Sequence, residues 1–312
     1  MTSPTSSISP VTVVGAGIAG AACVRVLHDA GVPFVLRDRG RAVGGRMSSP
    51  ELHGRRVDVG AGYFTVRDDG FRDVVSDWAS RGLVHEWTDT FTVVRAGAQP
   101  EQKSGPTRWG TPAGLRSLVK DLLSDIPVDA TEAQALPDGH VVLAMPDPQA
   151  TRLVTVPDAV DYDPVVAVVL GLTDDDAAGL PFPDAAFVSD EADVEFLARD
   201  GARRGDGAAV LVAQTSAQRA RRHLDDPAGA VPAVVDAVAA LTGIGAPTWT
   251  HAHRWTFAKP ASQHEASHGI VTHGDRLVGF AGDQWCPQGS PRIESAWRSG
   301  TDLGHALIAR LG

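Results

Sequence analysis

The segment Val11-Thr12-Val13-Val14-Gly15-Ala16-Gly17-Ile18-Ala19-Gly20 decides the fold of this chain. Its first residues predict a buried strand, and the glycines that follow have the spacing G-x-G-x-x-G at the start of a helix. In such a turn the first glycine permits a tight bend, the second lets a pyrophosphate approach the backbone, and the third lets the helix pack against the strand. The helix N-terminus also attracts phosphate. The segment therefore predicts a binding site for an adenine dinucleotide.

Asp38 supports this prediction. It lies 18 residues after Gly20, at the end of the expected strand Pro33–Arg37. A carboxylate at this point can accept hydrogen bonds from ribose hydroxyls. The sequence thus predicts an α/β protein with a Rossmann-type domain built on a parallel sheet.

Composition excludes several classes of protein. The 312 residues are 43% hydrophobic and 21% charged, which is ordinary for a globular protein. The formal charge of −10 argues against nucleic acid or an anionic membrane as the main partner. Two cysteines, Cys23 and Cys286, give no disulfide framework, and residues 1–10 lack the features of a signal peptide. We expect no membrane span, a short disordered tail at residues 1–10 and a cytoplasmic location.

A second glycine-rich loop favours FAD over NAD. Gly44-Gly45 would let the chain wrap tightly against a phosphate or ribityl chain, and Arg46 is placed to neutralise a pyrophosphate. The segment Val57–Phe64 adds a further glycine-rich stretch. A nicotinamide-binding Rossmann domain has no use for a second loop of this kind.

A third segment near the C-terminus fits the same cofactor. Leu277–Asp283 predicts a buried strand that ends in glycine and aspartate, and a helix follows from about Arg292-Ile293. Asp283 would accept from the ribityl chain, and the helix N-terminus would stabilise negative charge on the flavin pyrimidine ring. The alternative is a strand, turn and helix that merely close an α/β core. The residues expected to bind FAD are Gly15, Gly17, Ile18, Ala19, Gly20, Asp38, Arg39, Gly44, Gly45, Arg46, Met47, Gly60, Ala61, Gly62, Tyr63, Gly282, Asp283, Arg292, Ile293 and Ala296.

Motifs along nearly the whole chain carry a family resemblance. Besides the first turn they are Asp38–Ser49, Asp58–Thr65, Ala144–Ala150, His253–Trp255, Pro260–Glu265, Gly282-Asp283 and Arg292–Gly300. With these motifs the chain resembles the FAD-dependent amine oxidase superfamily, and within it the bacterial renalase-like proteins. The first and last motifs are common to the superfamily, whereas the middle ones point to the renalase-like branch.

The chain departs from that branch in three places. Gly62 stands where glutamine is expected, so a polar group near the flavin is missing. The stretch from Glu132 to Val141 is too short for the usual β-meander, which predicts a simplified adenine side of the cofactor site. The loop at residues 284–291 is longer than usual and lies close to the expected position of the flavin ring.

The resemblance implies a function. It is the oxidation of 2- or 6-dihydro isomers of NAD(P)H to NAD(P)⁺ by hydride transfer to N5 of a noncovalent FAD, with dioxygen reduced to hydrogen peroxide. A stacked nicotinamide would be walled by residues expected in the catalytic site, namely Tyr63, Trp109, His253, Trp255 and Trp285. The alternatives are an amine oxidase or desaturase for a small metabolite, and a non-catalytic flavin-binding redox sensor. The expected partners are a small-molecule substrate and dioxygen, in a monomer or homodimer.

We expect two discontinuous domains. Residues 1–68, 105–150 and 275–312 would bind FAD, whereas residues 69–104 and 151–274 would form a substrate domain with a mixed or antiparallel sheet and helices. In the substrate domain the patterns predict a helix from residue 69, strands at 90–94, 165–170, 208–213 and 249–255, and a helix at 232–241.

Three features allow competing interpretations. His264–His268 matches H-E-x-x-H, but Pro260 and Gly269 bracket a segment too short for the helix of a zinc protease, so we expect a loop and no metal. His251, His253 and Trp255 share one face of a strand, which would bind zinc, form a structural cluster or line a substrate pocket. Lys259 is a candidate for the lysine that amine oxidases hold near the flavin, or a solvated side chain.

Overall fold

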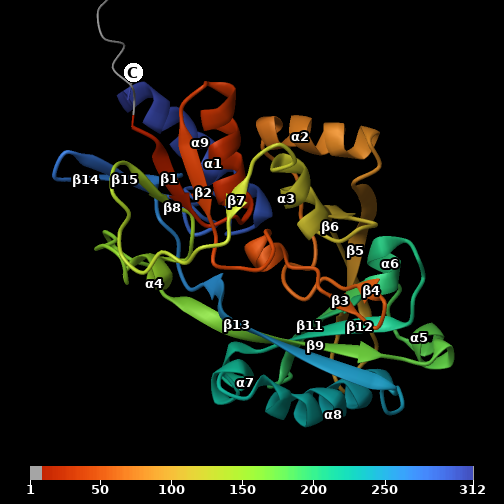
Figure 1. The fold of residues 1–312 in the computed structure, drawn as a ribbon. Helices are drawn as coiled ribbons and strands as arrows, with labels where there is room; N and C mark the ends of the chain where they lie inside the picture. Colours follow the sequence, from red (N-terminus) through yellow and green to blue (C-terminus); the bar gives the residue numbers. More distant parts are fainter. Residues whose placement is uncertain (1–8, 312) are drawn as a thin grey trace, which may run out of the picture. The chain divides into compact units, whose positions relative to one another are not determined.

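The computed structural model describes residues 9–311, which divide into two compact units (Figure 1). Unit 1 combines Met1–Gly45, Val119–Asp161 and Pro260–Gly312, and unit 2 combines Arg46–Leu118 and Tyr162–Lys259. Both units are therefore discontinuous in sequence. Residues 1–8 of the expected tail lie outside the described part.

The units and the predicted domains are defined differently. Residues 46–68 and 105–118, expected in the FAD-binding domain, belong to unit 2. Residues 151–161 and 260–274, expected in the substrate domain, belong to unit 1. The predicted domains follow from cofactor motifs in the sequence and the units from packing, so the domain boundaries remain predictions.

Unit 1 contains the predicted parallel sheet. Its strand order is β14-β15-β8-β1-β2-β7, and all neighbouring strands run parallel except β14 and β15. The strands are β1 (Val11–Val14), β2 (Phe34–Arg37), β7 (Val128–Asp129), β8 (Val141–Leu143), β14 (Gly269–His273) and β15 (Arg276–Phe280). In β1, Val11 and Val13 are fully buried, as expected for a parallel strand in a sheet that is covered on both faces.

The sheet of unit 1 is covered on two faces. Gly279 of β15 lies against Leu303 of α9 (Ile293–Leu311), and α9 packs along α1 (Ile18–Asp29), as Figure 1 shows. On the opposite face, Phe280 and neighbouring strand residues pack against the segment that contains α4 (Asp147–Ala150). Between β7 and β8 the described chain contains no strand, as the short sequence predicted.

Small residues let α1 and α9 touch. A Cβ added at Gly300 would lie 1.9 Å from the carbonyl oxygen of Ala19, and one at Gly304 would lie 2.8 Å from Cβ of Val26. The contact therefore requires residues without side chains at this spacing of α9.

Unit 2 is built on a mixed sheet with the order β13-β9-β12-β11-β10-β5-β6. The printed pairings are antiparallel except that β10 and β5 run parallel. The strands are β5 (His85–Val94), β6 (Glu101–Gly110), β9 (Tyr162–Gly171), β10 (Ala185–Val188), β11 (Val194–Arg199), β12 (Val210–Thr215) and β13 (Trp249–Pro260). A hairpin of β3 (Glu51–Leu52) and β4 (Arg55–Arg56) forms a separate two-stranded sheet.

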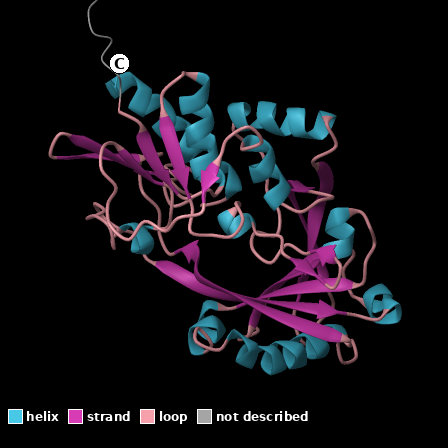
Figure 2. Cartoon of the chain, in the orientation of Figure 1, coloured by secondary structure: helices cyan, strands magenta, loops and turns pink. Residues whose placement is uncertain are grey.

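Both faces of the central strands in unit 2 are buried. Val166, Val168 and Leu170 of β9 pack in a cluster with residues of α7 (Ala217–Arg222) and α8 (Val231–Thr242), which lie on one face in Figure 2. Ala167 and Val169 point to the other face and pack with Val57 and its neighbours. The remaining helical segments are α2 (Asp69–Ser80), α3 (Arg116–Leu122), α5 (Asp174–Gly179), α6 (Asp200–Arg204), η1 (Gly45–Met47) and η2 (Pro227–Ala230).

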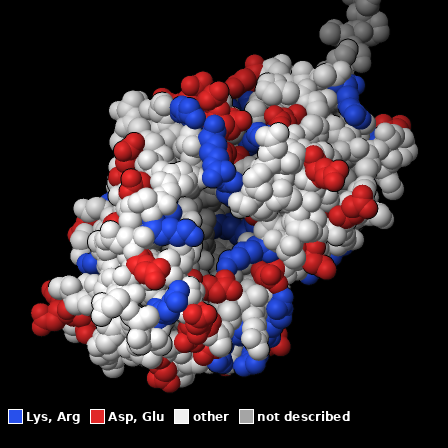
Figure 3. All heavy atoms as spheres, turned by 180° about the vertical axis from the view of Figure 1, so that it is seen from behind, with Lys and Arg blue, Asp and Glu red and all other residues white. Residues whose placement is uncertain are grey.

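The predicted elements are confirmed, most of them with longer bounds. The helix expected from residue 69 is α2, which buries Phe71, Val75 and Trp78, and the helix expected at 232–241 is α8. The expected strand at 90–94 is the end of β5, which begins at His85. The expected strand at 249–255 is the start of β13, which continues to Pro260. Within residues 9–311, no helix combines the length and apolar character needed to cross a membrane. On the face drawn in Figure 3, acidic and basic side chains are interspersed.

Replacement of Gly300 by alanine tests the helix contact. We expect Gly300→Ala to lower the free energy of unfolding by about 1–3 kcal/mol, because the added methyl group overlaps the backbone of α1. Gly179→Ala is the matched control, since a Cβ there meets no described atom within 4 Å. Urea unfolding measures both changes, and equal losses for the two variants would contradict the proposed overlap.

Candidate functional site

The turn between β1 and α1 has the geometry that its glycines predict. Gly15 has a φ of +110°, and a Cβ there would lie 2.3 Å from the carbonyl oxygen of Ala144. A Cβ at Gly20 would lie 1.9 Å from the carbonyl oxygen of Gly15. Side chains at these two positions would therefore push α1 away from the sheet.

Gly17 differs from these two glycines because its open side meets no described protein atom within 4 Å. It is the residue before the first turn of α1, where no side chain of the described residues caps the helix. The first N–H groups of a helix have no partner within the helix. The open side and the free donors fit a pyrophosphate, and the cofactor roles of Ile18 and Ala19 remain predictions.

Asp38 directly follows β2 and is bound to the same turn. Its Oδ2 accepts from the N–H of Ala16 at 2.6 Å, and its Oδ1 accepts from the N–H of Gly40 at 2.6 Å. The second glycine-rich loop also reaches the turn, because the N–H of Gly44 donates to the carbonyl oxygen of Ala16 at 2.8 Å. The structure thus brings together the first two motifs that the sequence separated by more than 20 residues.

The C-terminal motif is fixed by two serines of α9. Ser299 Oγ accepts from the N–H of Gly282 at 3.1 Å, and Ser295 Oγ donates to the carbonyl oxygen of Asp283 at 3.2 Å. Ser295 Oγ also accepts from the N–H of Arg292 at 2.9 Å, just before α9 begins at Ile293. The helix begins near Arg292-Ile293, as predicted, and its first turn lies beside the Gly282-Asp283 turn. Arg39 forms an exposed ion pair with Glu132 at 3.6 Å.

The H-E-x-x-H segment is a loop, as predicted, and its first histidine is part of a buried network. His264 Nε2 lies 2.7 Å from Oδ2 of Asp147, and Oδ1 of Asp147 accepts from Nε2 of Gln284 at 2.8 Å. The imidazole stacks on Trp285, with ring centroids 3.6 Å apart. Trp285 is only 6% exposed, which leaves little of its surface for the substrate contact that we predicted. Among the described residues, no three His, Cys, Asp or Glu side chains gather to hold a metal ion.

In unit 2, three side chains hold the carbonyl groups of the predicted flavin-binding segment. Trp255 Nε1 donates to Val59 at 2.8 Å, Gln214 Nε2 donates to Gly60 at 2.7 Å, and Arg203 Nη1 donates to Gly62 at 2.8 Å. The donors come from β13, β12 and α6, so three elements fix one short stretch of backbone.

The N–H groups of this segment differ from its carbonyl groups. Ala61 donates to the carbonyl oxygen of Arg46 at 2.9 Å. Within the described chain, however, the N–H groups of Gly60, Gly62 and Tyr63 have no acceptor. Such donors are rare when buried, as at Gly60. Electronegative atoms of a flavin ring would satisfy them, so the segment fits the predicted cofactor.

Arg203 belongs to a buried network of charges. It forms an ion pair with Asp200, and Arg204 pairs with Asp200 at 2.9 Å and with Asp58 at 3.3 Å. Burial alone would raise the pKa of Asp200, but the positive charges of Arg203 and Arg204 outweigh it, and the pKa is lowered. Burial opposes the charge of Arg203 too, yet the carboxylates of Asp200 and Asp58 raise the pKa of its guanidinium. Both groups therefore stay charged, and Arg203 can hold Gly62.

The predicted substrate residues of unit 2 lie in aromatic surroundings. Tyr63 packs edge-on against Phe91 at 5.1 Å, and Trp109 lies nearly parallel to Phe64 at 6.3 Å. His253 contacts Trp255, with ring centroids 4.5 Å apart. Burial, and then the neighbouring His251 and Arg116, lower the pKa of His253. Its imidazole is therefore neutral at pH 7.

Sequence reasoning missed several of the residues that shape these segments. Asp200 with Arg203 and Arg204 has the i, i+3 and i, i+4 spacing of helical ion pairs, which was a usable signal. Gln214 and Asp147 gave none, because their partners are distant in sequence.

Lys259 forms an exposed ion pair with Glu195, and Arg254 donates to the carbonyl oxygen of Leu224.

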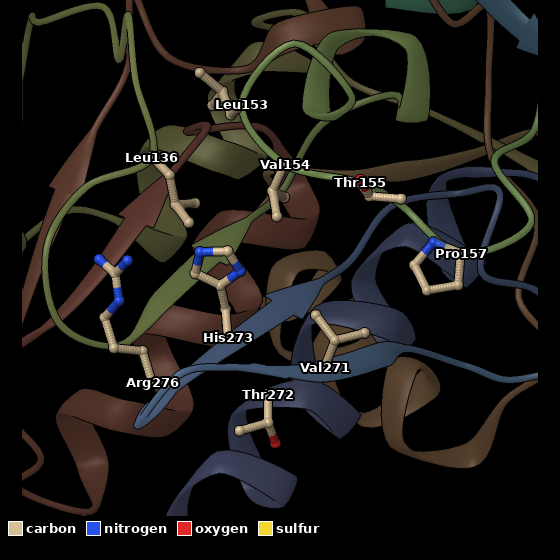
Figure 4. A pocket seen from close by; sticks show the side chains of 9 residues that line it. All are labelled: Leu136, Leu153, Val154, Thr155, Pro157, Val271, Thr272, His273 and Arg276. Carbon is tan, nitrogen blue, oxygen red and sulfur yellow. The ribbon is translucent and has the colours of Figure 1, made fainter.

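Two of the hollows in the described part of unit 1 have volumes of similar size. One, of about 540 Å³, is lined by side chains that Figure 4 shows around β14, namely Leu136, Leu153, Val154, Thr155, Pro157, Val271, Thr272, His273 and Arg276. It contains none of the predicted site residues. The other, of about 530 Å³, includes His264 and Trp285 in its wall.

The fold is also found in known proteins. Residues 13–78 match the family described as NAD(P)-binding Rossmann-like domain. A putrescine oxidase bound to putrescine shares 12% identity over 96% of this chain and 99% of its own, with a TM-score of 0.71. Cyclohexylamine oxidase from Brevibacterium oxydans IH-35A shares 13% identity over 97% and 99%, with a TM-score of 0.69. At these identities the likeness establishes the fold, with a Rossmann-type unit and a second, mixed sheet.

Replacement of Asp200 tests the buried network. We expect Asp200→Asn to lower the free energy of unfolding by about 3–5 kcal/mol, because it leaves Arg203 and Arg204 with too little negative charge. Asp206→Asn is the control, since Asp206 binds the same Arg55 but is 51% exposed, and its loss should cost less than about 1 kcal/mol.

The same comparison has a pH dependence. The pKa of Asp200 is lowered on folding, so its contribution to stability is present above its unfolded pKa of about 3.9 and is lost as the pH falls through the folded value. Urea unfolding at pH 7 and in this acidic range measures the difference. Equal stabilities of the two variants at pH 7 would refute the role of the network.

Proposed function

We propose that this protein is an FAD-dependent oxidoreductase, and that it oxidises isomeric dihydronicotinamide nucleotides in the manner of renalase-like proteins. The observation that carries the cofactor is the set of donors left free at the predicted cofactor residues. They are the first N–H groups of α1 beside Gly17, and the N–H groups of Gly60, Gly62 and Tyr63. The whole-chain likeness to two oxidases supports the class of reaction.

Residues of unit 1 would hold the dinucleotide. The open side of Gly17 would admit the pyrophosphate to the N-terminus of α1, where backbone donors and the helix dipole stabilise negative charge. Asp38 keeps lone pairs for a ribose hydroxyl although each of its oxygens already accepts one N–H. The start of α9 beside Asp283 would stabilise charge near the ribityl chain and ring.

Residues of unit 2 would position the groups that react. When bound, FAD supplies a hydride acceptor at N5 and passes two electrons to dioxygen, which yields hydrogen peroxide. The backbone N–H groups of Gly60, Gly62 and Tyr63 would donate hydrogen bonds to the ring. The side chains of Gln214 and Arg203 would keep this backbone rigid. Rigid donors stabilise the negative charge that develops in the transition state.

The resemblance to renalase-like proteins supports the dihydronicotinamide as the donor of the hydride. Loss of hydride from a dihydropyridine needs no general base. The flat rings of Trp255, Tyr63 and Trp109 suit contact with a planar nicotinamide.

An amine is the second candidate for the hydride donor. The likeness to structures of putrescine oxidase and cyclohexylamine oxidase favours it. Lys259, the candidate for the amine oxidase lysine, instead forms an exposed ion pair with Glu195. A redox sensor without turnover would carry the same cofactor motifs, and only an assay of turnover separates it from an enzyme.

Gly17→Ala tests the cofactor site. The methyl group meets no described protein atom, so we expect the stability to change by less than about 1 kcal/mol. It would occupy the space of the pyrophosphate, so the dissociation constant of FAD should rise at least about tenfold. Fluorescence titration of the apoprotein with FAD measures the effect, with Gly179→Ala as control. Unchanged affinity in Gly17→Ala would place the dinucleotide elsewhere.

Anaerobic reduction of the FAD-loaded protein tests the donor. We expect fast loss of flavin absorbance with 2- or 6-dihydro isomers of NAD(P)H, and none with ordinary NADH or with amines. Bleaching by an amine alone would establish the second candidate instead. Reduction by no donor would favour the redox sensor, and a protein that never binds FAD would refute the whole proposal.

A further inference from the structure

One face of β13 carries a row of rings. Trp249, His251, His253 and Trp255 alternate along the strand, so their side chains share a face. His53, in the turn of the β3–β4 hairpin, stacks on Trp249 with ring centroids 4.1 Å apart and an interplanar angle of 21°. Three imidazoles from two elements therefore line one strip of unit 2.

The stacked pair is held in place at both ends. His53 has a φ of +48°, a conformation that is costly for a residue with a side chain. Arg55, two residues further, anchors the hairpin through its ion pair with buried Asp200 at 2.8 Å. On the other side, the indole of Trp249 lies over Gly171, where a Cβ would be 2.1 Å from Nε1. The imidazole of His53 is thus held by fixed neighbours.

Arg116 supplies positive charge beside the strip. Arg116 and Arg56 converge on the carbonyl oxygen of Ser49, at 3.5 and 3.4 Å. His53 acts on His251, and His251 and Arg116 act on His253; of these neighbours Arg116 carries a permanent positive charge. Carboxylates of the adjoining segments are paired with arginines, since Glu51 pairs with Arg56 at 3.6 Å and buried Asp58 pairs with Arg204.

The imidazoles of the strip are unused as donors. In the described part of the chain, no hydrogen bond is formed by the rings of His53, His251 or His253. His251 and His253 are half-buried, so water reaches them. Residues two apart on a strand are about 7 Å apart. A phosphate group that accepts one bond of about 2.8 Å on each of two oxygens spans a similar distance.

We propose that His251 and His253, together with His53 and Arg116, form a binding site for a phosphate group. We name these four residues the His–Arg strip. The positive charge of Arg116 favours an anion, and the free ring nitrogens supply the donors. A metal site is not an alternative, because no three such ligands are gathered within residues 9–311.

We infer that the phosphate group belongs to a nucleotide, and this choice rests on the proposed function. The flat rings of Trp249 and Trp255 flank the two histidines along β13, so a ring or ribose next to the phosphate would find apolar contact. The phosphate site itself does not depend on the flavin.

The site has a defined pH dependence. Burial, and then the neighbouring His53, lower the pKa of His251, and burial together with His251 and Arg116 lowers the pKa of His253. Both rings are therefore neutral at pH 7, and an anion must draw protons onto them. Binding should strengthen as the pH falls below the ordinary histidine pKa of about 6.5.

Calorimetric titration of the FAD-loaded protein with ADP, pyrophosphate and adenosine tests the proposal. We expect ADP and pyrophosphate to bind and adenosine not to bind. His251→Gln and His253→Gln should each weaken ADP about three- to tenfold. His305→Gln is the control, because His305 is an exposed histidine of α9 in unit 1. Sulfate, which stays a dianion, should bind more tightly at pH 6 than at pH 8.

The outcomes separate the proposal from its rivals. Unchanged ADP affinity in both histidine variants would overturn it, and so would adenosine binding as tightly as ADP. Pyrophosphate binding without ADP binding would restrict the site to free anions and overturn the nucleotide. If the protein lacks FAD but still loses ADP affinity in these variants, the proposed function fails and the phosphate site stands.

A second measurement avoids variants altogether. Diethyl pyrocarbonate modifies neutral imidazoles, and mass spectrometry reports each modified histidine. We expect ADP to protect His251 and His253 in the unaltered protein and to leave His305 unprotected. Modification of His251 and His253 that ADP does not slow would also overturn the proposal.

Discussion

Contact between backbones is the constraint on which unit 1 depends. At Gly15 the turn touches the carbonyl of Ala144, which follows β8, and at Gly20 helix α1 touches the carbonyl of Gly15. At Gly300 helix α9 touches the carbonyl of Ala19 in α1. Three glycines thus hold the sheet, the turn and two helices together without any side chain in between. The donors at the start of α1 stay near the end of the sheet because the glycines let the backbones of these elements approach each other directly.

Unit 2 fixes its part of the candidate site by the opposite means. There the backbone from Val59 to Gly62 is held by long polar side chains, and one of them, Arg203, is fully buried with its counter-ions. A buried guanidinium is expensive unless its charge is balanced. Asp200 and Asp58 provide that balance. The fixed orientation of the free N–H groups therefore depends on a buried network of charges.

The local motifs could be predicted, whereas the distant partners could not. The β1 turn, Asp38 and the start of α9 follow from glycine spacing and apolar periodicity, which act over a few residues. Gln214 binds Gly60 across 154 positions, and no pattern in the sequence marks that pair. Trp285 shows the limit in another way, because its residue type suggested an open ring wall but His264 covers it. Packing between distant segments decides such details.

The division of the chain also constrains how the protein is made. Strands β1 and β2 come from the first segment of unit 1, β7 and β8 from the second, and β14 and β15 from the third, yet all six share one sheet. While the ribosome is building Tyr162–Lys259, the second segment of unit 2, the outer edge of β8 has no neighbour and the face of α1 that α9 covers is bare. The nascent chain therefore carries an incomplete Rossmann sheet for most of its synthesis. Its dinucleotide turn gains its last support only when α9 has emerged.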